Sequence, residues 1–350
     1  METNQHPSTE NNSSQGGCLR CRSLAVLHGY PNPLCESCRE ALIKFPIPSW
    51  VKLFAGGIGL LLAFSIYKIP ANISLGVHLE KGKTAIAEKK YLTAQRELQK
   101  VVDKVPGNIE AEGNLLIAAF YNEDFLTMNN MSIELKGKNI EDDVLYHKMD
   151  NAVTAVDGYF PDDSLNALIQ KHDSNYANIP DAELKKFIEK NPEDLYAMAG
   201  LAARMINKEQ LADADSLLVK ALAINADYMP ALGMMSSLKR EEKQFDESIV
   251  YCDRALYINR ESVYVISSKS RTLLRQKKDD EALRLALAAS KLDETDVYAQ
   301  GTLLLAYHFM NKGKEENAIM TKLSSMKDSS SIVVLNYIKD VFSGKESFRN

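Results

Sequence analysis

The sequence lacks the common signatures of catalysis. It contains no GxGxxG motif, no P-loop, no HExxH and no GxSxG. Its six histidines are scattered without partners at metal-ligand spacing. The acidic pairs Asp142-Asp143 and Asp162-Asp163 stand at predicted helix starts, where negative charge interacts favourably with the helix dipole. We therefore expect a protein that is not an enzyme and has no catalytic residues.

An excess of basic charge is also missing. The chain has 42 Lys and Arg against 47 Asp and Glu, which gives a formal net charge of −5. Nucleic-acid binding depends largely on Lys and Arg contacts to phosphates. The few basic residues near the N-terminus are not accompanied by a set of aromatic side chains on which bases could stack. We expect no nucleic-acid partner.

Cysteine is scarce and unevenly placed. Of five cysteines, one is Cys252, and the others form two CxxC pairs, Cys18 with Cys21 and Cys35 with Cys38. A disulfide scaffold would spread its cysteines through the fold. Two CxxC turns joined by a loop can present four thiolates to one metal, and this spacing predicts a tetrahedral structural zinc site. Iron in a rubredoxin-like site remains an alternative.

Residues 18–42 resemble a zinc ribbon. A segment of this size cannot build its own core, so a bound metal must hold it. Four protein ligands leave no open coordination position, which favours a structural metal over a catalytic one. A redox or electron-transfer role for the CxxC pairs is the competing interpretation. Residues 1–17 are rich in Asn, Ser, Gln and Gly, and we expect them to be disordered.

One long hydrophobic run, residues 50–69, stands out from the rest of the chain. It carries no charge from Leu53 to Tyr67 and is flanked by Pro48 and Pro70. About 20 helical residues cover the ~30 Å hydrocarbon layer of a bilayer. The run therefore predicts one transmembrane helix in contact with lipid.

The membrane prediction carries an orientation and a dimer hypothesis. Metal-binding thiols persist best in a reducing compartment, which places the N-terminus in the cytoplasm. The C-terminal part would then be extracytoplasmic, in a bacterial periplasm or an equivalent space. Ala55, Gly59 and Ala63 form a stripe of small residues that would let two membrane helices approach closely as a homodimer.

The remainder of the chain contains an internal repeat. Segments 214–221, 248–255 and 282–289 each begin and end with Ala or Ser, and their starts lie 34 residues apart. Small residues are needed where the two helices of one unit cross closely, and larger apolar residues fill the space between neighbouring units. The pattern resembles the tetratricopeptide repeat (TPR), a helix–turn–helix unit of about 34 residues. The resemblance implies an all-α solenoid.

The repeat and the preceding segments divide the chain into predicted parts. The solenoid occupies residues 75–343, with units near 75–108, 109–142, 195–228, 229–262, 263–296 and 297–330, an irregular stretch at 143–194, and a capping helix at 331–343. A closing helix is expected because a solenoid exposes the apolar face of its last unit.

The family resemblance also implies a groove lined by the first helix of each unit. The lining positions here hold Tyr196, Met234, Tyr264, Arg271 and Tyr298. We expect this groove to receive an extended peptide or a helix of a partner protein. The alternative is that the tyrosines only pack neighbouring units against each other.

These observations predict a membrane-anchored scaffold or adapter for protein–protein interaction, with a structural zinc ribbon at its N-terminus. The alternative is a metal- or redox-responsive regulator of membrane or envelope biogenesis that acts through the CxxC pairs.

Overall fold

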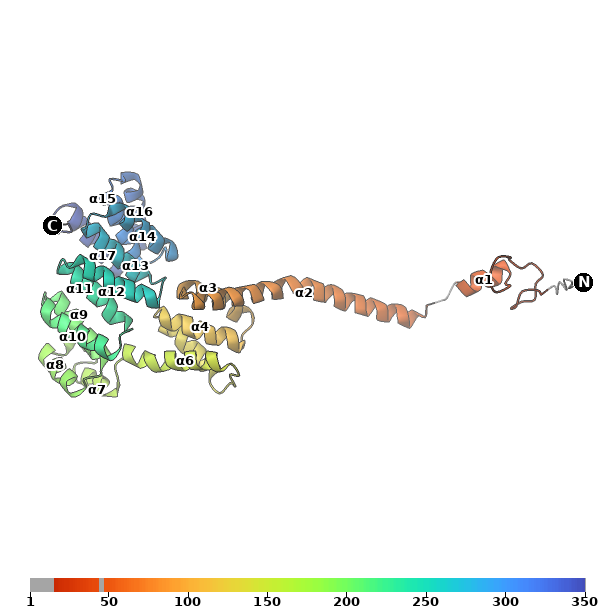
Figure 1. Cartoon of the computed structure of the whole chain (residues 1–350), viewed down its shortest axis with the longest axis horizontal. Coiled ribbons are helices and arrows are strands. Elements are labelled where there is room, and N and C mark those ends of the chain that lie inside the picture. Colours follow the sequence, from red (N-terminus) through yellow and green to blue (C-terminus); the bar gives the residue numbers. More distant parts are fainter. Residues whose placement is uncertain (1–15, 44–46, 350) are drawn as a thin grey trace, which may run out of the picture. The chain divides into compact units, whose positions relative to one another are not determined.

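The computed structural model describes residues 16–43 and 47–349, except for the side chains of residues 66–72 (Figure 1). Most of the predicted disordered segment, 1–15, lies outside the described residues. The chain divides into two compact units, Met1–Asn72 and Ile73–Asn350.

The first unit contains the cysteine module and the start of a long helix. Helix α1 (Glu36–Ile43) begins directly after Cys35. Helix α2 (Ser49–Ala87) begins after Pro48, whose carbonyl accepts a hydrogen bond from the amide of Val51 at 2.9 Å. Proline before a helix is favourable because its fixed φ and missing N–H cost nothing there.

The transmembrane helix predicted at residues 50–69 is not supported by the structure. No helix in the part of the chain that the structure describes is long and apolar enough to cross a membrane. The run is only the first part of α2, which does not stop at position 70 but continues into a segment with Glu80, Lys81 and Lys83. The predicted single-pass topology, with a cytoplasmic N-terminus and an extracytoplasmic solenoid, is therefore wrong.

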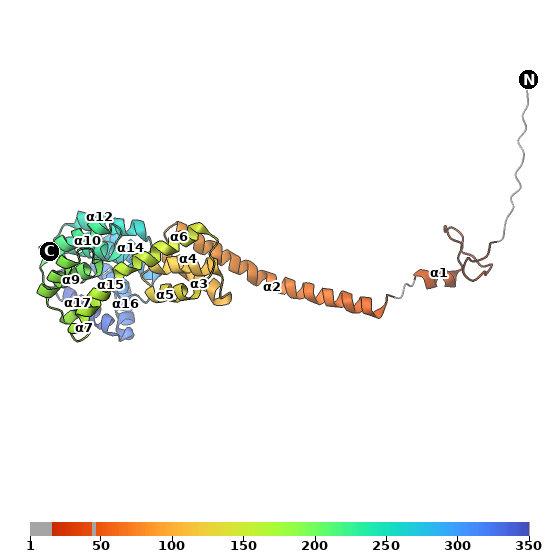
Figure 2. The ribbon, with the colours of Figure 1, turned by 90° about the horizontal axis from the view of Figure 1, so that it is seen from below.

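The second unit is built from helices, and the described residues contain no strand (Figures 1 and 2). After α2 the helices are α3 (Tyr91–Lys104), α4 (Ile109–Tyr121), α5 (Phe125–Leu135), α6 (Asp143–Ala155), α7 (Asp163–Lys171), α8 (Asp181–Lys190), α9 (Leu195–Asn207), α10 (Leu211–Ile224), α11 (Met229–Glu241), α12 (Phe245–Ile258), α13 (Val263–Arg275), α14 (Asp279–Leu292), α15 (Val297–Phe309), α16 (Gly313–Met326) and α17 (Ser329–Phe342). Two short 3₁₀ turns, η1 (Val156–Tyr159) and η2 (Tyr176–Asn178), flank α7.

The backbone repeats with the period seen in the sequence. A residue with left-handed φ near +60° follows the first helix of each pair. Such residues recur at intervals of 34 residues, at Glu209, Lys243, Lys277 and Asn311. At each, the amides of this residue and the next bond back to the end of the preceding helix, as from Lys243 to Arg240 and from Gln244 to Lys239. This left-handed helix ending satisfies carbonyls that would otherwise lack donors. The all-α helical-repeat fold is therefore confirmed.

Small residues lie where the paired helices meet. Ala214, Ala221, Ala255 and Ala289 are all fully buried, and Leu218 fills the core between the first two. Contacts join each helix to its pair, as α9 to α10 and α11 to α12, and also α11 to α13 and α13 to α15. Helix packing therefore follows the predicted stacking. The exact unit boundaries remain a prediction.

The irregular stretch 143–194 breaks the pairing. It forms α6, α7 and α8, which are joined by the two short 3₁₀ turns. Tyr228 ties it to the repeats, since its ring meets that of Tyr159 at 5.2 Å and its hydroxyl donates to the carbonyl of Gly158 at 2.9 Å. A buried tyrosine needs such a hydrogen-bond partner.

The beginning of the second unit contacts its middle. The amide of Arg260 donates to the carbonyl of Lys89 at 2.9 Å, and the buried Asn259 side chain donates to the carbonyl of Tyr121, also at 2.9 Å. Glu261 accepts from the amide and the hydroxyl of Thr93, each at 2.7 Å. In an ordinary solenoid each repeat contacts only its neighbours. Here the path of the helices brings the α12–α13 loop into contact with the start of α3 and the end of α4 (Figure 1).

Glu261 acts as an N-terminal cap for α3 across this contact, because the side chain of Lys90 at the cap position makes no capping hydrogen bond. We expect Glu261→Ala to destabilise the second unit by about 2 kcal/mol, since two hydrogen bonds to a charged acceptor are lost. Hydrogen exchange at the Thr93 amide should accelerate. Glu247→Ala, an exposed change on α12, is the control, and unchanged Thr93 exchange in Glu261→Ala would contradict the capping role.

Candidate functional sites

The four N-terminal cysteines form one cluster. The sulfur atoms of Cys18, Cys21, Cys35 and Cys38 all lie within 4.8 Å of one another, and those of Cys21 and Cys35 are 3.5 Å apart. Around them the loop is held by backbone hydrogen bonds, including Arg22 to Cys18 at 2.8 Å. The predicted convergence of the two CxxC turns is confirmed.

Backbone geometry of the first CxxC turn requires a glycine just before it. A Cβ added to Gly17 would lie 2.7 Å from the carbonyl oxygen of Arg22, a backbone atom that cannot step aside. The amide of Cys18 donates to the carbonyl of Ser23 at 2.8 Å, which closes the turn. The glycine therefore allows the close backbone approach that brings Cys18 and Cys21 to the same side.

The local electrostatics favour thiolates in this cluster. Hydrogen bonds from backbone amides, first that of Cys35, lower the pKa of Cys18 to about 6. The amide of Cys38 and the hydroxyl of Ser37 lower the pKa of Cys35. Bonds to the Cys35 and Cys21 sulfurs raise the pKa of Cys38 to about 12. The Cys38 thiol can therefore donate a hydrogen bond to a neighbouring sulfur, an arrangement that a bound cation would replace.

The arrangement fits a tetrahedral metal. In a zinc site with Zn–S bonds of about 2.3 Å, neighbouring sulfurs lie about 3.8 Å apart, close to the distance between Cys21 and Cys35. Within 16–43, the described part of the module, only Cys18 and Cys35 are buried. The module has no apolar core in these residues, so the sulfur cluster is its centre.

Three of the five predicted groove residues come together in the second unit. The rings of Tyr264 and Tyr298 stack at 5.2 Å, and the Arg271 guanidinium lies 3.9 Å from the centre of the Tyr298 ring. Tyr264 remains 44% exposed, yet the surrounding protein raises its pKa by desolvation. Tyr264 is therefore accessible to solvent while it packs against Tyr298.

Two arginines at this face are buried, and Arg240 forms an ion pair from Nε to Glu241 Oε1 at 3.7 Å. Arg271 is 8% exposed and donates from Nε to the Thr302 hydroxyl at 2.8 Å, while its Nη2 has no hydrogen-bond partner. Arg240 is 7% exposed and donates from Nη1 to Ser268 Oγ at 2.8 Å. Buried charge is normally paired, and the buried Nη2 of Arg271 departs from this because it has no hydrogen-bond partner.

The remaining predicted site residues lie elsewhere. Tyr196 meets the ring of Tyr176 at 5.8 Å, and Met234 packs against the core cluster of α9 and α10. Ala55, Gly59 and Ala63 are exposed on α2. A dimer through these three residues depended on a membrane span, which none of the described helices provides.

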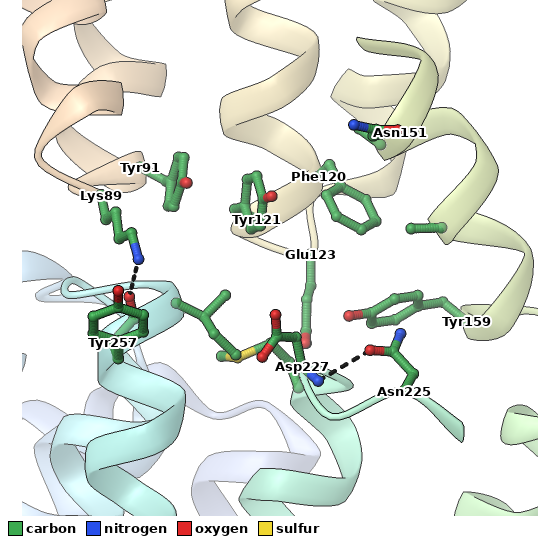
Figure 3. A pocket seen from close by; sticks show the side chains of 14 residues that line it. Lys89, Tyr91, Phe120, Tyr121, Glu123, Asn151, Tyr159, Asn225, Asp227 and Tyr257 are labelled. Carbon is green, nitrogen blue, oxygen red and sulfur yellow. Dashed lines mark hydrogen bonds between the residues drawn. The ribbon is translucent and has the colours of Figure 1, made fainter. Parts of the chain in front are cut away.

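A hollow lies where the early and middle helices meet, and no sequence pattern predicted it. This cavity of about 270 Å³ is walled by Tyr91, Tyr121, Tyr159 and Tyr257, with Glu123 and Asp227 beside them (Figure 3). Its walls come from α3, α4, α6, η1, α11 and α12, together with the α2–α3 and α4–α5 turns and the α10–α11 loop. No local pattern could have indicated it, because segments more than a hundred residues apart form it.

Comparison with known proteins returns helical-repeat structures. No protein-family model matches the chain, and no curated protein matches its sequence. Among solved structures, it is similar to YrrB, a TPR protein with an unusual peptide-binding site, at 16% identity and TM-score 0.36, covering 52% of this chain and 90% of that one. A tetratricopeptide repeat protein from Parabacteroides merdae matches at 12% identity and TM-score 0.41, covering 78% and 88%. Yeast Tom70 matches at 15% identity and TM-score 0.38, covering 72% and 60%.

Proposed function

We propose that this protein is a scaffold for protein–protein interaction, which holds a peptide or helix of a partner on the face formed by Tyr264, Arg271 and Tyr298. The observation that carries the proposal is the stacked tyrosine pair with buried arginines beside it. Tyr and Arg are the residues that most often dominate binding energy at protein interfaces.

The face has the composition of a recognition surface. Tyr264 offers a large rigid ring whose hydroxyl already lies 3.3 Å from Ser237 Oγ. Gly233 lets this ring pack closely on α11, since a Cβ at that position would lie 3.0 Å from the nearest ring carbon. The Nη2 group of Arg271 is a buried donor without a hydrogen-bond partner. Apolar ring surface together with convergent donors suits a polypeptide segment better than a small apolar ligand.

A site-specific crosslinking experiment tests this proposal. A photoreactive phenylalanine analogue placed at Tyr264 should give discrete adducts with a partner protein in cells, and Tyr298→Ala should reduce their yield by about tenfold, as expected for an interface tyrosine. The analogue at Tyr146, which is 50% exposed on α6, is the matched control. Equal adducts at both positions, or none at Tyr264, would refute a partner site on this face.

We further propose that the cysteine cluster holds one zinc ion that keeps the N-terminal module folded. Cys18, Cys21, Cys35 and Cys38 would supply all four ligands, and the ion would contribute binding free energy to folding rather than to any reaction. The alternative, a metal- or redox-responsive regulator, would use the same sulfurs, of which those of Cys21 and Cys35 lie 3.5 Å apart.

A further inference from the structure

The hollow between the early and middle helices is lined by aromatic rings at close range. Tyr91 and Tyr121 stack at 4.2 Å, and Phe120 meets Tyr159 at 5.7 Å in an edge-on arrangement. Figure 3 shows Tyr91, Tyr121 and Phe120 along the upper part of the cavity, with Tyr159 at the right and Tyr257 at the left. A group that enters would therefore meet ring faces and hydroxyls from several directions.

Two carboxylates share this hollow and have no partner among the described residues. Glu123 follows α4 in a left-handed turn with φ +59°, and Asp227 lies in the α10–α11 loop. Neither carboxylate makes a hydrogen bond or an ion pair with a described residue. Figure 3 shows both carboxylates in the lower part of the cavity.

The surroundings give these carboxylates a partly desolvated setting. Glu123 is accessible to water, yet burial by nearby protein raises the pKa of its carboxyl. Its negative charge contributes to raising the pKa of Tyr159, and Asp227 does the same for Tyr121. The rings and the carboxylates thus act on one another, and a positive charge placed among them would be stabilised by both.

The cation already present does not occupy the centre. The Lys89 ammonium donates to the carbonyl of Tyr257 at 2.8 Å and lies 3.6 Å from the centre of the Tyr257 ring. It is held at the rim by these contacts and makes no ion pair with Glu123 or Asp227. The cavity wall therefore has two carboxylates without a described cationic partner, while the ammonium group of Lys89 is held by Tyr257.

We propose that this cavity binds an organic cation, an alkylammonium or guanidinium group, with Glu123 and Asp227 as its counter-ions and the tyrosine rings as its walls. The volume of about 270 Å³ is below the usual 300–1,000 Å³ of small-molecule and cofactor sites and suits one Lys or Arg side chain. The inference does not depend on the partner face at Tyr264, which shares no residue with this cavity.

Titration of the full chain with methylguanidinium, followed by ligand-observed NMR, tests the proposal. The neutral N-methylurea has the same shape and should bind at least about tenfold more weakly, because it lacks the charge. Glu123→Gln and Asp227→Asn should each weaken methylguanidinium binding by about tenfold while leaving the circular dichroism spectrum unchanged. A capped pentapeptide with one central Arg between glycines, compared with its Gln analogue, separates a protein side chain from a free cation as the source.

The repeat offers a matched control for the charge change. Glu209 occupies the same left-handed turn position in another pair, with φ +60°, and is exposed away from the cavity. Glu209→Gln should leave binding unchanged. Equal affinity for methylguanidinium and N-methylurea, or equal weakening by Glu209→Gln and Glu123→Gln, would overturn the proposal. Stronger binding by the Arg peptide than by methylguanidinium would support a partner's side chain as the ligand, and the reverse a free cation.

Discussion

Replacing Cys35 by Ser is expected to abolish metal binding by the N-terminal module and to unfold that module alone. The reason is that the described module has no buried residues other than Cys18 and Cys35, so the free energy that orders it must come from the metal. Structural zinc sites supply roughly 10–16 kcal/mol at neutral pH, far more than such a short segment gains otherwise. A serine hydroxyl cannot replace the thiolate.

Metal analysis of the purified full chain checks this expectation. The unaltered protein should contain about one metal per chain, zinc by elemental analysis, and Cys35→Ser should contain none. Iron with visible thiolate charge-transfer bands would instead support electron transfer. Cys252→Ser is the matched control, because Cys252 is buried in α12 far along the chain and is not a ligand. Full metal retention by Cys35→Ser would show that the four sulfurs are not one site.

Thermal unfolding of the helical unit should be unaffected by the loss of metal. The second unit, Ile73–Asn350, has its own core clusters and does not draw on the cysteine module for them. The helical signal of Cys35→Ser should therefore fall only slightly at 25 °C. Loss of the thermal unfolding transition of the second unit in Cys35→Ser would contradict the independence of the two units.

Leu218→Ala is expected to cost about 3 kcal/mol of stability in the second unit. Leu218 on α10 is fully buried between the small residues Ala214 and Ala221, where the paired helices approach most closely. Removing its side chain loses the transfer free energy and leaves a cavity that the rigid crossing cannot fill. Because repeats unfold with coupled but separable steps, the loss should appear first as faster hydrogen exchange in α9 and α10.

The control for this change is the same substitution on an exposed surface. Leu126 on α5 is 73% exposed, and Leu126→Ala should alter stability by less than about 0.5 kcal/mol. Denaturant unfolding, followed by far-ultraviolet circular dichroism, compares the two variants directly. Similar losses for both would mean that the α9–α10 crossing is not a close-packed core.

The sequence specified the local design of the second unit. A 34-residue period in small residues reports the helix crossings, because only Ala, Ser or Gly fits where two helices touch. The same period returns in the left-handed turns at Glu209, Lys243, Lys277 and Asn311. The CxxC spacing likewise predicted the sulfur cluster, since each turn fixes two thiols locally and one loop joins them.

The hydrophobic run shows where a local pattern misleads. Residues 50–69 are apolar, but the helix that contains them extends to Ala87 and takes its later turns into the repeat unit. Hydropathy in a window reports the composition of a segment and not where its helix begins and ends. Of the two prolines that flank the run, only Pro48 stands at an end of the helix, since α2 continues past Pro70.

What the sequence determined by itself is the set of contacts between residues close along the chain: the helix pairs, their turns and the CxxC cluster. The tertiary structure alone decided which distant segments meet. Glu261 caps α3 from 168 residues away, and the tyrosines and carboxylates of the cavity come from six separate helices and loops. The physical reason is that small rotations between successive repeats accumulate, and the point at which the chain returns to its beginning depends on their sum and on the irregular stretch 143–194, which no short-range periodicity records.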